Sequence, residues 1–114
     1  MNANVAYKRA STGSHKSKIN TYLENQILNS KPEELVLKVY DFILLNIKKK
    51  NYNKANAGII ELIAALNFDY QDVSLGLFKL YTYCQNQIRK ENWTEAQEII
   101  QDIRNSWAKA FNYN

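Results

Sequence analysis

The sequence predicts an all-α fold, an antiparallel up-down four-helix bundle with a short N-terminal helix or strap. Three observations support this fold class. Apolar residues recur at helical spacing through most of residues 31–111, and no segment of any length alternates with the two-residue period of a strand. One proline and three glycines are too few for a fold built from many turns. The stretches between the predicted helices are short, which favours antiparallel neighbours.

Residues 1–20 form a predicted flexible basic arm, and residues 21–114 a single helical domain. The arm is rich in Ser, Asn and Lys, shows no sustained apolar period and has no acidic residue. Its basic residues are Lys8, Arg9, Lys16 and Lys18. Of the 15 basic residues in the chain, the other 11 match the 11 acidic residues, so the helical domain is neutral overall. We therefore expect no nucleic acid partner, because that function predicts a basic stripe on the folded domain.

Residues that would support catalysis or cofactor binding are missing from the predicted bundle. The only histidine, His15, lies in the arm, so neither a Glu-x-x-His metal site nor a histidine base for a cysteine nucleophile is available. We expect no enzyme activity, no cofactor and no metal. No apolar run approaches the ~20 residues of a membrane span, the N-terminus lacks a secretory signal, and the single Cys84 fits a reducing compartment. These observations predict a cytoplasmic protein without membrane insertion.

A short helix or ordered strap is predicted over residues 19–29, where the apolar residues Ile19, Tyr22, Leu23, Ile27 and Leu28 fall partly at helical spacing. The first long helix begins at residue 31 or 32 and runs to about residue 50. Its start has two interpretations. Either Ser30 and Glu33 form a capping box, or Pro32 occupies the first helical position and Lys31 is the cap.

The first long helix carries more apolar residues than one buried face needs, ten of the thirteen at positions 35–47. At about 100° per residue, one face consists of Leu35, Val36, Val39, Ile43 and Ile47. Leu37 and Leu44 lie together well round from that face, with Tyr40 between them. The helix therefore either lies at the centre of its domain or carries a second apolar face that contacts a partner.

The second long helix is predicted over about residues 53–68, after a turn at residues 51–53 with capping chemistry. Its main stripe is Ala55, Ile59, Leu62, Ile63 and Leu66. A narrower ridge on another side consists of Ala57, Ile60 and Ala64. This ridge indicates either tight packing within the bundle or contact with an outside partner.

The third long helix is predicted over about residues 72–90, with Asp69 or Asp72 as its cap. Leu75 and Phe78 fall outside its predicted core face, which consists of Val73, Leu77, Leu80, Tyr81, Cys84 and Ile88. The last helix is predicted to begin at a Thr94 cap and to end near residue 111. Its single apolar stripe is Trp93, Ala96, Ile99, Ile100, Ile103, Trp107, Ala110 and Phe111.

Four blocks of sequence follow one another between residues 22 and 111. The first two are YLENQILNSKPEEL (residues 22–35) and VLKVYD (residues 36–41). The third is NKAN (residues 53–56) with LN (residues 66–67), and the fourth is LYTY (residues 80–83) with IRNSW (residues 103–107). In order and spacing these blocks resemble the flagellar secretion chaperones of the FliS family. The chain departs from the family pattern at Lys31, at Phe42 and in a shorter loop after Asn67 that lacks Gly-Gly.

The resemblance implies a cytosolic chaperone that wraps the disordered C-terminal segment of flagellin, prevents its premature polymerisation and aids its delivery to the flagellar export gate. It also implies that the N-terminal strap occupies part of the partner's groove and can be displaced. With the surplus apolar positions, the predicted partner-binding residues are Tyr22, Ile27, Leu28, Leu37, Tyr40, Leu44, Ala57, Ile60, Ala64, Leu75 and Phe78. The alternative is a structural or regulatory helical protein that uses its surplus face for homo-oligomerisation, and the oligomeric state stays open.

Overall fold

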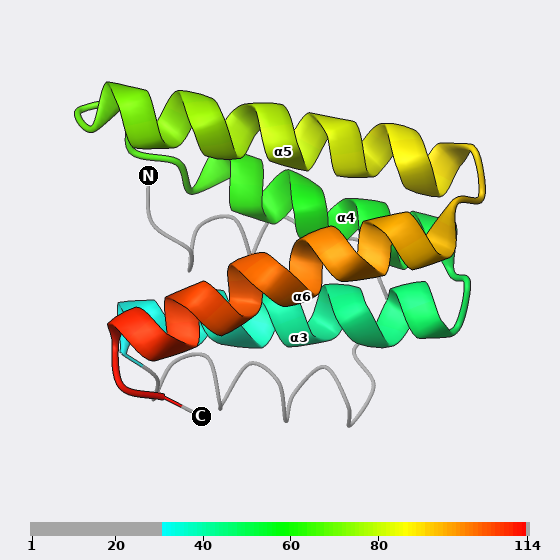
Figure 1. Cartoon of the computed structure of the whole chain (residues 1–114), viewed down its shortest axis with the longest axis horizontal. Helices are drawn as coiled ribbons and strands as arrows, with labels where there is room; N and C mark the ends of the chain where they lie inside the picture. The colour runs from blue at the N-terminus through cyan, green and yellow to red at the C-terminus, as the bar shows by residue number, and fades with distance from the viewer. Residues whose placement is uncertain (1–30, 114) are drawn as a thin grey trace, which may run out of the picture.

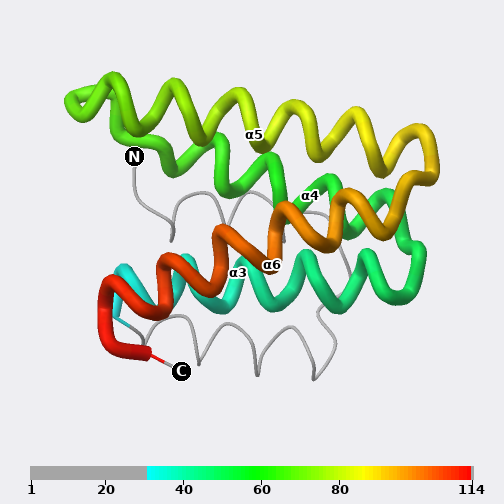
Figure 2. The backbone as a smooth tube through the Cα atoms, viewed as in Figure 1, coloured from blue at the N-terminus to red at the C-terminus, as the bar shows by residue number. Residues whose placement is uncertain are grey.

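The computed structural model describes residues 31–113, and within them it contains four helices and no strand. The helices are α3 (Pro32–Lys48), α4 (Tyr52–Ala64), α5 (Gln71–Arg89) and α6 (Trp93–Ala110). Successive helices run in opposite directions, and α6 returns to pack beside α3 (Figure 1). α4 and α6 lie between α3 on one side and α5 on the other (Figure 2). The predicted up-down four-helix bundle is confirmed, while the predicted arm and strap lie outside the described residues.

For two of the four helices, the residues predicted from the sequence to begin the helix do so in the structure. Pro32 is the first residue of α3 and Lys31 its N-cap, so the second of the two predicted starts is right. The side chain of Asn51 caps α4 by accepting a hydrogen bond of 3.1 Å from a backbone amide in the first turn. The predicted caps of α5 and α6 are wrong. These helices follow Tyr70 and Asn92, and neither residue makes a side-chain cap.

Three helices end in the same left-handed turn. Lys50 after α3, Glu91 after α5 and Asn112 after α6 have φ angles of 55°, 64° and 62°. In each turn the next amide reaches back to a carbonyl five residues earlier, as Asn51 N does to Asn46 O at 2.8 Å. This is the Schellman pattern, in which glycine is the usual residue because it has no Cβ to strain. Backbone hydrogen bonds therefore hold these turns closed despite the side chains.

One hydrophobic core runs through all four helices. α3 and α4 come close together at Gly58, where a Cβ atom would lie 2.5 Å from Cγ1 of Ile43. The fully or nearly fully buried members of the core are Tyr40, Ile43, Ile47, Ala55, Ile59, Leu62, Tyr81, Cys84, Ile88, Ala96 and Ile100. No helix in residues 31–113 is long and apolar enough to cross a membrane.

Two residues predicted to face the core of α5 are exposed, because α6 moves away from α5 along its length (Figure 1). The two helices meet near their shared turn, where Asn92 Nδ2 donates to Gln87 Oε1 at 2.8 Å. Farther on, α6 packs against α3, and Trp107 Nε1 donates to the Glu33 carbonyl at 2.8 Å. Val73 and Leu80, on the α6 side of α5, are therefore 65% and 42% exposed.

Candidate partner-binding surface

Two hydrogen bonds join the antiparallel α5 to α4 and to the turn that follows α4. Gln85 Nε2 donates to Asn56 Oδ1 at 2.8 Å, and Ser74 Oγ donates to the Asn67 carbonyl at 2.5 Å. The two bonds are separated by eleven residues on each segment, so one register holds along the whole seam. It places Ile63 opposite Phe78, since each lies seven residues from the Asn56–Gln85 pair.

Five of the predicted partner-binding residues lie along this seam and form an apolar surface, which we call the α4–α5 face (Ala57, Ile60, Ala64, Leu75 and Phe78). Ile60, Leu75 and Phe78 are 49%, 43% and 38% exposed. Ala57 is exposed and Ala64 half-buried. The alanine side chains project less from the helix than those of Ile60, Leu75 and Phe78. The expectation that these positions are surplus to the core is confirmed for the four exposed residues.

The expected open face of α3 is wrong at two of its three positions. Leu37 is 7% exposed, and Tyr40 is fully buried. The Tyr40 ring reaches the centre of the bundle, where its hydroxyl lies 2.6 Å from that of Tyr81 on α5. Its ring also meets Trp107 edge to face, with 6.4 Å between the centroids. Leu44 is half-buried against the core. The exposed apolar residue of α3 is instead Leu45.

Burial controls the chemistry of the two central tyrosines. Loss of solvent raises the pKa of Tyr40, and the neighbouring Tyr81 raises it further. Loss of solvent also raises the pKa of Tyr81, although its hydrogen bond to Tyr40 works in the opposite direction. Both hydroxyls therefore stay protonated and neutral at physiological pH. They serve the bundle as a hydrogen-bonded pair and are not available to a partner on the surface.

Sequence reasoning missed an apolar group at the turn between α4 and α5. Phe68, Tyr70 and Val73 are 54%, 70% and 65% exposed. The signal was available for Phe68 and Tyr70, two aromatic residues on either side of Asp69 in the connection, whereas Val73 lies in the first turn of α5 and was predicted to face the core. These residues, which we call the turn cluster, lie at the end of the seam where Ser74 bonds to Asn67.

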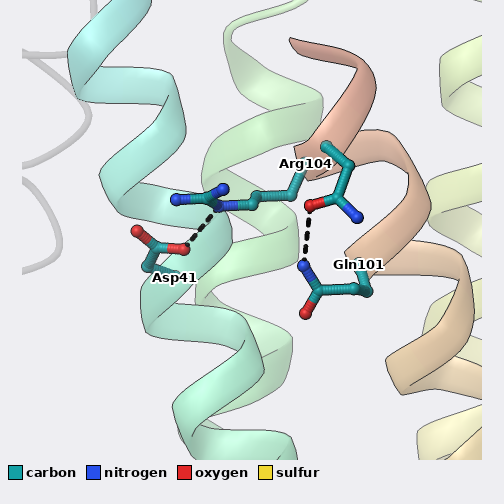
Figure 3. A network of polar contacts seen from close by, with 4 residues as sticks. Asp41, Gln101 and Arg104 are labelled. Carbon is teal, nitrogen blue, oxygen red and sulfur yellow. Dashed lines mark hydrogen bonds and ion pairs between the residues drawn. The ribbon is translucent and has the colours of Figure 1, made fainter. Parts of the chain in front are cut away.

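The opposite seam, between α3 and α6, is polar. Figure 3 shows Arg104 of α6 reaching Asp41 of α3, where Nε and Oδ1 are 3.0 Å apart. Beside it, Gln101 Nε2 donates to Asn105 Oδ1 at 2.9 Å. The Asp41 side chain is 52% exposed, so this ion pair contributes at most about 1 kcal/mol. A partner that binds through apolar contacts would therefore meet more exposed apolar side chains along α4 and α5.

Reactive or metal-binding groups do not gather in the described part of the chain. No three His, Cys, Asp or Glu side chains in residues 31–113 are placed to hold a metal ion. Cys84 is fully buried, and burial raises its pKa to about 12. The predicted strap residues Tyr22, Ile27 and Leu28 lie outside the described residues.

Comparison with known proteins identifies one family. The family model described as flagellar protein FliS matches residues 15–112, which is most of the chain and includes all four helices. No curated protein and no solved structure matches the chain. The family match agrees with the order of the four sequence blocks and with the bundle. The chain therefore belongs to the FliS family of flagellar chaperones.

Proposed function

We propose that this protein is a cytosolic export chaperone that binds the C-terminal segment of flagellin along the α4–α5 face. Membership of the FliS family supports the general role of a flagellar export chaperone. The single observation that carries the choice of surface is the row of exposed apolar side chains along the α4–α5 seam. An amphipathic helix is the fitting occupant, since it lays one apolar stripe against such a seam.

The energetics require a contact larger than the face alone. Burying a large apolar side chain completely is worth about 1.5–3 kcal/mol, and Ile60, Leu75 and Phe78 are each less than half exposed. Covering these three supplies only about 3 kcal/mol by that measure. Ordering a disordered client costs about 2–5 kcal/mol. We therefore include Phe68 and Tyr70 of the turn cluster in the proposed contact, because they are 54% and 70% exposed, and we leave out Val73, which lies on the α6 side of α5.

The remaining predicted residues take other roles in this proposal. Tyr22, Ile27 and Leu28 form the strap that covers part of the groove and is displaced by the client. Leu44, which packs against the core on α3, makes no direct contact with the client in this proposal. Because Leu37 and Tyr40 are buried, we no longer propose direct contacts for them. The export gate is the second proposed partner, which receives the loaded chaperone.

Ile60→Glu tests the surface, with Leu45→Glu as the matched control, since both residues are 49% exposed. We expect Ile60→Glu to melt like wild type and to bind a flagellin C-terminal peptide at least ~10-fold more weakly in calorimetry, because the client would bury an unpaired charge. Leu45→Glu, on α3, should bind at full strength. Full-strength binding by Ile60→Glu would remove the α4–α5 face from the site.

Homo-oligomerisation through the same face is the alternative function. Sedimentation of wild type and Ile60→Glu without peptide separates the two. A wild-type monomer that binds the peptide supports the chaperone. A wild-type dimer that Ile60→Glu converts to a monomer, with no binding of the peptide, supports the alternative.

A further inference from the structure

The antiparallel arrangement brings two turns to one end of the bundle. The α3–α4 turn and the α5–α6 turn lie together at the right in Figure 1. Six exposed basic residues gather there, and we call this surface the basic end (Lys48, Lys49, Lys50, Lys54, Arg89 and Lys90). The acidic residues near it are Glu91, Glu95 and Glu98, which lie with Trp93 around one surface pocket. A domain that is neutral overall therefore has one end with a net positive charge.

Helix capping explains only part of this charge. Lys48 and Arg89 lie in the last turns of α3 and α5, where a cation balances the helix dipole. Lys54 is in the first turn of α4, where the same dipole disfavours a cation. Lys49 and Lys50 add charge beyond the helix end. The surplus positive charge at this end is consistent with a role in binding.

We propose that the basic end docks the protein on an anionic phospholipid surface. The cations stand on two separate turns and present a broad end rather than a groove, which suits a plane of headgroups. Tyr52, which is 36% exposed, and the half-buried Trp93 begin α4 and α6 at this same end. Amphipathic rings beside lysines are typical of protein surfaces at the membrane–water boundary. Contact through the end leaves the sides of the helices free, including the α4–α5 face.

The strength and salt dependence of docking follow from the charges. Each lysine near an anionic bilayer raises affinity about fivefold. Glu91, Glu95 and Glu98 oppose three of the six cations, so docking is reversible and weakens as salt screens the exposed charges. Docking of this kind is peripheral and independent of flagellin binding.

Vesicle flotation of the full chain tests the proposal. The arm is neutralised in every sample by Lys8→Gln, Arg9→Gln, Lys16→Gln and Lys18→Gln, so that it does not contribute. Into this chain we would introduce Lys49→Gln, Lys54→Gln and Lys90→Gln. The matched control carries Lys31→Gln, Lys79→Gln and Lys109→Gln, which remove the same charge from exposed positions elsewhere on the bundle. Circular dichroism verifies that all the chains are folded.

We expect the arm-neutralised chain to float with vesicles of phosphatidylcholine and phosphatidylglycerol at low salt and not with phosphatidylcholine alone. The basic-end variant should bind about a hundredfold more weakly and the matched control about as well as its parent. Equal losses in both variants, or no flotation of the parent, would overturn the proposal. So would binding to duplex DNA that depends on the same lysines without binding to vesicles.

Discussion

Tyr40 and Tyr81 place two hydroxyls at the centre of an apolar core, 2.6 Å apart and almost completely inaccessible to solvent. Each hydroxyl depends on the other, because the core offers it little else. Tyr40→Phe or Tyr81→Phe alone should cost about 1–3 kcal/mol of unfolding free energy, since the remaining hydroxyl loses its partner. The double variant should cost clearly less than the sum of the two. Urea unfolding of all four chains measures this coupling, and strictly additive losses would contradict it.

Cys84 makes stability depend on alkaline pH. Burial raises the pKa of its thiol from 9.0 to about 12. Below pH 9 the thiol is neutral in both states and has no effect. Between pH 9 and about pH 12 only the unfolded chain loses the proton, so the folded state loses up to about 1.4 kcal/mol per pH unit.

We therefore expect the free energies of unfolding of wild type and Cys84→Ala to run parallel up to about pH 9 and to converge above it. Tyr40 and Tyr81 destabilise both chains in the same way above about pH 10, so the difference between the curves isolates the thiol. Urea unfolding at several pH values provides the measurement. Parallel curves throughout would show that the thiol ionises as easily in the folded protein.

At the scale of helices, the same substitution should have opposite effects at two glycines. A Cβ at Gly58 of α4 would lie 2.5 Å from Ile43 Cγ1 and 3.3 Å from the Phe42 ring. Ile43 is fully buried, so the overlap cannot be relieved cheaply, and Gly58→Ala should destabilise by about 1–3 kcal/mol. Gly76 in α5 has no atom within 4 Å of such a Cβ. Gly76→Ala should therefore stabilise by about 0.5–1 kcal/mol.

Thermal melting of both glycine variants beside wild type checks the sign of each effect. Because each substitution adds one methyl group to a helix interior, each serves as the control for the other. Melting shifts in the same direction would mean that helix propensity, rather than the close approach of α3 and α4, determines the outcome.

The sequence was sufficient to predict the helices and most of the apolar seam, because both depend on periodicity. Helical spacing placed Ile60 and Phe78 outside the main stripes of their helices, and both are exposed. Helical spacing predicts the direction in which a side chain points. It does not predict over what length a neighbouring helix stays in contact with that side. Val73 points toward the core side of α5 yet is exposed, because α6 has moved away to meet α3.

Side-chain length explains the error at Tyr40 on the candidate surface. The angular position of Tyr40 placed it between Leu37 and Leu44, at the border of a proposed outer face. Its long ring instead crosses into the bundle and ends at the Tyr81 hydroxyl. A helical wheel assigns a direction to the Cβ atom and contains no information on where a six-membered ring and its hydroxyl end.

The whole molecule should unfold as one unit, because a single core connects its four helices. Trp93 and Trp107 lie at opposite ends of α6 and report on opposite ends of the bundle. In Trp93→Phe and Trp107→Phe, the remaining indole should give a fluorescence midpoint that coincides with the circular dichroism midpoint of the same variant. Midpoints that differ between the two probes would show that the ends melt separately.

The contact of α3 with α6 joins the first and last described helices, through Trp107 with Glu33 and Arg104 with Asp41. A ribosome synthesises these partners some seventy residues apart. While the chain is still growing, α3 and α4 can pair, but the side of α3 that belongs to α6 stays uncovered, including the Tyr40 edge that meets Trp107. The bundle therefore closes only after α6 has been synthesised. Before α6 arrives, a member of this chaperone family thus itself exposes apolar surface that it later buries.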